Sequence, residues 1–166
     1  MNESLENLPL YIKAEQINEL VSKVADLIEE CDEDADAEKK MMQYFKEYLT
    51  NSSRLIPAKI AGVYDEEILY DIKMETATII RREARYILAY TTSLKELSFK
   101  DVDYLKLIRD EIEEFRILFA EWVKTFNKQN YKIDGWGLFN PPGVNIDDYD
   151  IEDDLPFDNP FDDDDF

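Results

Sequence analysis

The 166-residue sequence contains no histidine. Histidine changes its charge near neutral pH and is the commonest metal ligand. Its absence therefore excludes histidine-based catalytic triads, zincin-type zinc sites and the helical Glu-x-x-His di-iron motif. Cysteine occurs once, at Cys31, which excludes an intrachain disulfide and a thiolate metal cluster. A single cysteine near a helix end, without a histidine to activate it, is typical of packing rather than of nucleophilic chemistry.

Glycine and long apolar runs are also scarce. The four glycines include no phosphate-binding loop, because Gly135, Gly137 and Gly143 lie outside any strand-to-helix context. No run approaches the about 18 apolar residues of a membrane span, and the chain does not start with the basic and apolar regions of a signal peptide. Ser52 and Ser53 have no evident base to activate them. We therefore expect a cytoplasmic protein with no cofactor and no membrane partner, and not an enzyme.

Positive charge is in deficit. The formal net charge is −20, from 39 acidic and 19 basic residues. Residues 146–166 hold 11 of the acids and no base, which leaves 28 acids against 19 bases, or −9, for residues 1–145. Binding to nucleic-acid phosphates needs clustered Lys and Arg, so we expect no direct nucleic-acid binding. An electrostatic partner should be basic, or should be a surface that normally holds DNA or RNA.

Apolar residues at helical spacing predict four amphipathic helices. Their approximate extents are residues 11–31, 37–61 and 65–94, with a fourth that opens at Ser98–Asp101 and carries the stripe Leu105, Ile108, Ile112, Phe115, Phe119, Trp122 and Phe126. Asp36 and Asp65 are expected N-caps, Ser98–Asp101 resembles a capping box, and Pro57 is expected to kink or break the second helix. Short connections make neighbouring helices antiparallel, so residues 1–131 should form an up-down-up-down four-helix bundle.

Residues 132–145 form an irregular segment, because Gly and Pro punctuate it. The segment nevertheless contains Trp136, Leu138 and Phe139, each of which loses about 1.5–3 kcal/mol when it stays in water. We therefore expect these side chains to fold back and cover an open end of the bundle. The alternative is an exposed aromatic loop that a partner protein binds.

A possible polar layer lies inside the bundle. Helical geometry places Glu83 within the apolar stripe of the third helix and, in an antiparallel arrangement, level with Glu111 of the fourth. Thr76 shares the face of Glu83 and should lie level with Ser52. We expect a structural layer that fixes helix register, the alternative being a carboxylate pair that binds a divalent ion or shares a proton. Arg81, Arg82 and Arg85 could likewise bind a phosphate or carboxylate, although ion pairs with nearby Glu residues are the simpler interpretation.

Residues 146–166 are expected to be a disordered tail, because so much like charge and so little apolar surface cannot offset the entropy of ordering. Large apolar side chains recur among the acids and could anchor a partner. The candidate partner-binding residues are Leu155, Phe157, Phe161, Asp162, Asp163, Asp164, Asp165 and Phe166.

Residues 152–157, and again residues 162–166 with the terminal Phe, resemble the acidic C-terminal tips of bacterial and phage single-stranded-DNA-binding proteins. The resemblance implies a partner pocket that accepts the Phe ring and a basic rim that accepts the carboxylates. DNA binding does not carry over, because that family has a β-barrel body and this body is helical. The match that ends at Phe157 is internal and lacks the free terminal carboxylate. The alternative is a tail that serves only to keep the protein in solution.

We therefore expect a non-enzymatic, adaptor-like protein that binds another protein through its acidic, Phe-bearing tail. The partner should have a basic, aromatic-accepting pocket. The alternative is a charge mimic, an inhibitor or immunity-type protein whose acidic body occupies a basic nucleic-acid-binding or toxin surface. A third possibility, a carboxylate metal enzyme built on Glu83 and Glu111, would require a bound metal.

Overall fold

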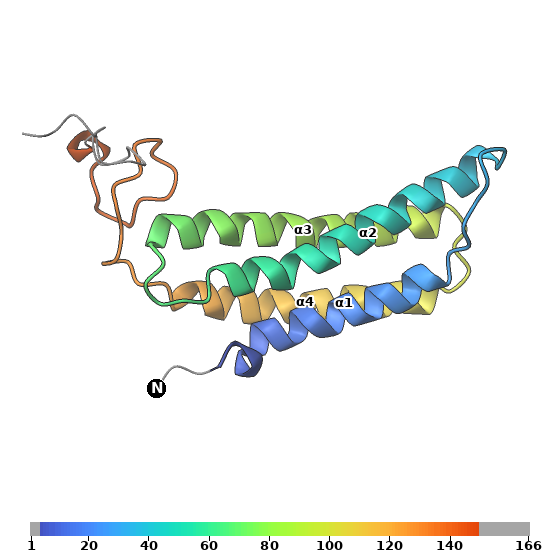
Figure 1. Ribbon diagram of the computed structural model, residues 1–166, viewed down its shortest axis with the longest axis horizontal. Coiled ribbons are helices and arrows are strands. Elements are labelled where there is room, and N and C mark those ends of the chain that lie inside the picture. The colour runs from blue at the N-terminus through green and yellow to red at the C-terminus, as the bar shows by residue number, and fades with distance from the viewer. Residues whose placement is uncertain (1–3, 150–166) are drawn as a thin grey trace, which may run out of the picture.

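The computed structural model describes residues 4–149 and contains four long helices (Figure 1). These are α1 (Pro9–Asp26), α2 (Ala37–Gly62), α3 (Tyr70–Glu96) and α4 (Val102–Lys124), with short 3-10 turns η1 (Leu5–Asn7) and η2 (Ile146–Asp148). Consecutive helices run antiparallel, and α1 packs on α4 as well as on α2 (Figure 1). The described residues contain no strand. The predicted up-down-up-down four-helix bundle is therefore confirmed.

The core is a continuous column of aliphatic side chains closed at one end by aromatic ones. Ile17 and Val21 of α1, Ile56 of α2, Ile80 of α3 and Ile108 of α4 are almost completely shielded from solvent. At the C-terminal end of α4, the rings of Trp122 and Phe126 meet edge to face at 4.7 Å, the geometry that aromatic pairs prefer. The stripe predicted for the fourth helix is buried along its length except for Phe119, which is half-buried.

Two helix boundaries differ from the prediction. Helix α1 ends at Asp26, and Leu27, which was expected inside it, is 47% exposed. A series of acids follows (Glu29, Glu30, Asp32), and negative charge at a helix C-terminus opposes the helix dipole. Helix α3 begins at Tyr70 rather than at residue 65, because the Asp65 carboxylate accepts a hydrogen bond from the Glu67 amide and closes a separate turn.

Pro57 does not break α2, which continues to Gly62. The proline removes one amide donor, so the carbonyl of Ser53 loses its helical partner. Pro57 is itself buried beside Ile56 and Ile60, and the burial of these apolar side chains offsets the lost bond. The predicted cap at the other end of this helix is confirmed, since Asp36 Oδ1 accepts the Lys39 amide at 2.9 Å.

Ser98 ends α3 instead of capping α4. Its φ is +63°, the left-handed conformation that usually selects glycine. The Phe99 amide donates to the Leu94 carbonyl and the Ser98 amide donates to the Lys95 carbonyl, which together form a Schellman motif. Leu94 and Phe99 are both buried, as the motif favours. The predicted capping box is therefore wrong, and the N-cap of α4 is Asp101, without a side-chain cap hydrogen bond.

After α4 the chain is tied to the α2–α3 connection. The Tyr70 amide donates to the Asn130 carbonyl at 2.8 Å, and the Asn130 side-chain amide donates to the Glu67 carbonyl at 3.0 Å. Residues 131–149 then extend beyond this end of the bundle (Figure 1). Ile146–Asp148 form η2, so the first residues of the segment expected to be disordered from residue 146 are ordered. Among residues 4–149, none of the helices has an apolar stretch of the length that a membrane crossing requires.

Candidate interaction site

A loop of residues 134–140 is held in place by the side chains at its two ends. The Asp134 carboxylate accepts hydrogen bonds from the backbone amides of Trp136 (2.9 Å), Leu138 (2.8 Å) and Phe139 (3.0 Å). The Asn140 side chain accepts from the Asp134 amide at 2.7 Å and donates to the Asp134 carbonyl at 3.0 Å. These five hydrogen bonds, with a sixth from the Gly137 amide to the Asp134 carbonyl at 3.0 Å, fix the path of this loop.

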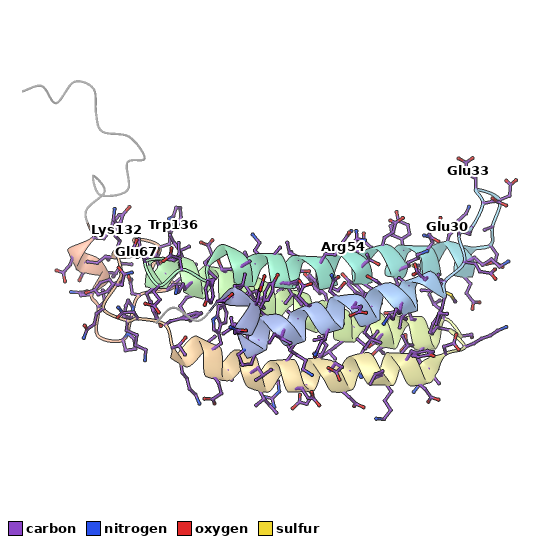
Figure 2. All side chains as sticks on the ribbon, turned by 60° about the horizontal axis from the view of Figure 1, so that its bottom comes forward. Glu30, Glu33, Arg54, Glu67, Lys132 and Trp136 are labelled. Carbon is purple, nitrogen blue, oxygen red and sulfur yellow. The ribbon has the colours of Figure 1, made fainter. Side chains whose placement is uncertain are left out.

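The loop presents its largest side chains to solvent. Trp136 is 87% exposed and Leu138 is 73% exposed, whereas Phe139 is half-buried and Pro141 is buried. Figure 2 shows Trp136 at the same end of the molecule as Glu67, on the segment outside the helices. The expectation that Trp136 and Leu138 cover the bundle is therefore wrong. Its physical reason is local: the amides that Asp134 binds turn both side chains outward.

Glycine makes this arrangement possible at two positions. Gly137 has a φ of +68°, which strains any residue with a side chain. Gly135 lies against the ring of Tyr149, and an added Cβ would come within 2.5 Å of that ring. Residues 146–149 therefore pack against the loop of residues 134–140. The loop and residues 146–149 together form a small unit outside the helices.

The electrostatics of the loop favour an ionised Asp134. Burial of this carboxyl group on its own would raise its pKa. The three backbone N–H donors of Phe139, Trp136 and Leu138 outweigh that effect, so the pKa of Asp134 lies below its ordinary value. The loop thus keeps its hydrogen bonds throughout the neutral range.

Inside the bundle, Glu83 is buried as predicted, with 6% of its surface exposed. Its Oε2 accepts a hydrogen bond from the Ser52 hydroxyl at 2.8 Å, and its Oε1 accepts from Arg82 Nη2 at 2.9 Å and Nε at 3.1 Å. Ser52 of α2 was expected to lie level with Thr76, which precedes Glu83 by seven residues on α3. The packing of α2 on α3 is therefore shifted by about two turns from the predicted register.

Glu111 and Thr76 do not join this layer. Glu111 accepts a hydrogen bond from Lys13 Nζ of α1 at 2.7 Å, and Lys13 also binds Glu114 at 2.6 Å. These two hydrogen bonds raise the pKa of Lys13. No hydrogen bond joins Glu111 or Thr76 to Glu83 within residues 4–149, so the predicted layer consists of Glu83 and Ser52 alone.

The arginines of α3 are paired only in part. Arg82 binds Glu83, but Arg81 and Arg85 form no ion pair with any described residue. The described chain also holds no group of three or more Asp, Glu or Cys side chains placed to bind a metal ion. The proposed tail anchors Leu155, Phe157, Phe161, Asp162–Asp165 and Phe166 lie outside the described residues.

A cluster of four tyrosines on α2 and α3 was not predicted from the sequence. Tyr44 and Tyr48 of α2 stack on each other at 5.9 Å, Tyr48 stacks on Tyr90 of α3 at 5.6 Å, and Tyr86 lies 5.9 Å from Tyr90. The signal was present, because each helix carries two tyrosines four residues apart and therefore on one face.

Comparison of the chain with known protein families, curated proteins and solved structures gave no match.

Proposed function

We propose that this chain is a protein-binding protein whose C-terminal region docks on a partner protein. The observation that carries the proposal is the ordered loop of residues 134–140, which holds Trp136 and Leu138 in solvent. Single exposed apolar residues are ordinary, but a tryptophan with most of its surface in water is costly to keep exposed. A fixed loop that exposes one offers a preorganised anchor to a partner.

The residue types agree with this role. Tryptophan is the side chain most enriched among residues that dominate binding energy, and fixing it before binding lowers the entropy lost on association. Nine acidic residues and three phenylalanines follow the described region, in residues 150–166. They support a partner with a basic rim around an aromatic-accepting pocket. No sequence feature supports direct nucleic-acid binding or a reaction chemistry.

The proposal is tested by capture from a lysate of the source organism. The full chain, a Trp136→Ser/Leu138→Ser variant and a chain that ends at Asp165 are immobilised at equal density. We expect both altered chains to lose the same captured protein. With that protein purified, the loop variant should bind at least about 30-fold more weakly, which corresponds to a loss of about 2 kcal/mol.

The matched control is Ile117→Ser, which removes another exposed apolar side chain, from a helix instead of from the loop. Ile117 is 54% exposed and lies in α4. This variant should retain full binding. Equal capture by the loop variant and the unchanged chain would refute the role of the loop. Equal capture by the chain without Phe166 would refute only the role of the terminal residue.

A second candidate function is charge mimicry, in which the acidic body occupies a basic surface. The observation that favours it is an open groove of about 550 Å³ along α1, lined by Glu6, Glu15 and Glu19 among other residues. Binding through distributed charge should weaken steeply as salt is added, whereas binding through Trp136 should weaken much less. A titration of the captured partner at increasing salt therefore separates the two functions.

A further inference from the structure

An open groove of about 650 Å³ runs between α2 and α3 over the Ser52–Glu83 hydrogen bond. Tyr48, Tyr86 and Tyr90 line it together with Leu55 and Ala58. The rings of these tyrosines contact one another across the two helices, and both Tyr48 and Tyr86 are more than two-fifths exposed. The groove is therefore an aromatic surface on a face that no other part of the described chain covers.

The charge of this groove differs from that of the body. Arg54 lines it and forms no ion pair with any residue of the described region. Arg82 stands at its edge, 6.0 Å from the Tyr86 ring, with its guanidinium on Glu83. Arg54 and Arg82 thus outnumber the one carboxylate of the groove, Glu83, which already accepts hydrogen bonds from Ser52 and Arg82. The body around the groove, by contrast, has a formal charge of −9 over residues 1–145. Figure 2 labels Arg54 on α2, and its side chain is exposed to solvent.

We propose that the segment of residues 157–166 of this same chain docks in the tyrosine groove. Its chemistry complements the groove: Phe161 supplies a ring for the tyrosines, and Asp158 and Asp162 flank that ring with carboxylates for Arg54 and Arg82. The groove thus has the two properties, a basic rim and an aromatic floor, that the acidic Phe-bearing segment requires of any partner.

The length of the chain beyond residue 149 allows this contact. The segment after α4 lies at the end of the bundle where α3 begins (Figure 1). The groove residues of α3, Glu83 to Tyr90, lie about 20–30 Å along the helix from Tyr70, at 1.5 Å per residue. Phe161 comes twelve residues after Tyr149 and can extend at most about 40–43 Å from it. That reach exceeds the 20–30 Å along α3, and the difference of about 10–20 Å is available for the path from Tyr149 back to the start of α3.

Docking of the segment on its own body has a consequence for binding. The acidic segment cannot occupy the groove and a partner pocket at once, so a partner that binds the segment competes with the groove for it. The inference goes beyond the proposed function, because the isolated protein suffices to test it. It also uses neither Trp136 nor Leu138, so the two proposals can fail separately.

The test is paramagnetic relaxation in the full-length chain. Cys31→Ser removes the single cysteine, and Asn159→Cys places a nitroxide label two residues from Phe161. We expect amide signals of residues 48–58 and 83–90 to lose intensity with the oxidised label, relative to the reduced label. The reduced sample also shows whether the bundle is folded. High salt should restore the lost intensity, because charge pairs contribute to the contact.

Matched charge reversals complete the test. Arg54→Glu should restore the groove signals, whereas Lys40→Glu, an equal change on the exposed face of the same helix near its N-terminus, should leave them attenuated. Undiminished groove signals in the labelled chain would overturn the proposal. Attenuation that appears only between labelled and separately isotope-enriched chains would also overturn it, because the occupant would then be the segment of a second copy.

Discussion

Ser52→Ala tests whether the buried contact between α2 and α3 contributes to stability. Ser52 donates its hydroxyl to Oε2 of Glu83 at 2.8 Å, and both residues are almost fully buried. Alanine leaves that carboxylate oxygen without its donor in a side chain of which only 6% is exposed to solvent. A hydrogen bond to a charged group contributes about 1.5–3 kcal/mol. Alanine in a helix recovers up to about 0.5 kcal/mol relative to serine. The expected net loss is about 1–2.5 kcal/mol.

The assay is urea unfolding of the full chain followed by far-ultraviolet circular dichroism. With a urea dependence of about 2 kcal/mol per molar, the midpoint should fall by about 0.5–1.25 M at unchanged slope. Ser93→Ala is the matched control, because Ser93 is also within a helix but donates only to the Ala89 carbonyl, at 3.1 Å. The free energy of unfolding of Ser93→Ala should change by no more than about 0.5 kcal/mol, as is usual for surface positions.

A double-mutant cycle separates the contact from other effects of the substitution. In a Glu83→Gln background the acceptor carries no charge, so Ser52→Ala should cost clearly less than in the unchanged chain. If Ser52→Ala and Ser93→Ala shift the midpoint equally, the hydrogen bond to Glu83 does not stabilise the fold, and the reasoning is refuted.

Two further predictions concern the ends of the bundle. The pKa of Asp134 is depressed in the folded loop, so its contribution to loop order is complete above about pH 4 and is lost as the pH falls through the depressed value. The amide resonances of Trp136, Leu138 and Phe139 should move together in that acid range, and Asp134→Asn should abolish the common titration. Ser98→Gly should stabilise the fold by about 0.5–1 kcal/mol, because glycine adopts the left-handed conformation without a Cβ clash. An unchanged or lower unfolding midpoint for Ser98→Gly would contradict this account.

The sequence was sufficient to predict the bundle and the burial of Glu83, because both follow from which residues share a helical face. It was not sufficient to predict the partner of Glu83. Moving α2 along α3 by seven residues is a shift of almost two whole helical turns. Such a shift leaves the apolar stripes of the two helices facing each other nearly as before. Apolar periodicity therefore could not distinguish the Ser52–Glu83 register from one in which Ser52 lies level with Thr76.

The loop shows a different limit. Hydrophobicity alone predicted that Trp136 would be buried, and the structure exposes it. The deciding interactions are hydrogen bonds from three backbone amides to one carboxylate, and composition does not report them. An Asp followed by two nearby glycines was the available signal, because Asp side chains readily bind amides a few residues ahead. The boundary at Asp65 was missed for the same reason, since that carboxylate closes a turn instead of capping α3.

The hydrogen bond between the Tyr70 amide and the Asn130 carbonyl has a consequence for how the protein is made. Asn130 follows Tyr70 by 60 residues. At about 5–20 residues per second, the ribosome adds it roughly 3–12 s later. Throughout that interval the turn between α2 and α3 lacks the acceptor that holds it in the finished protein, although the hairpin of α2 and α3 can form once Glu96 has been added. The connection between the second and third helices is therefore completed by a residue that is synthesised after all four helices.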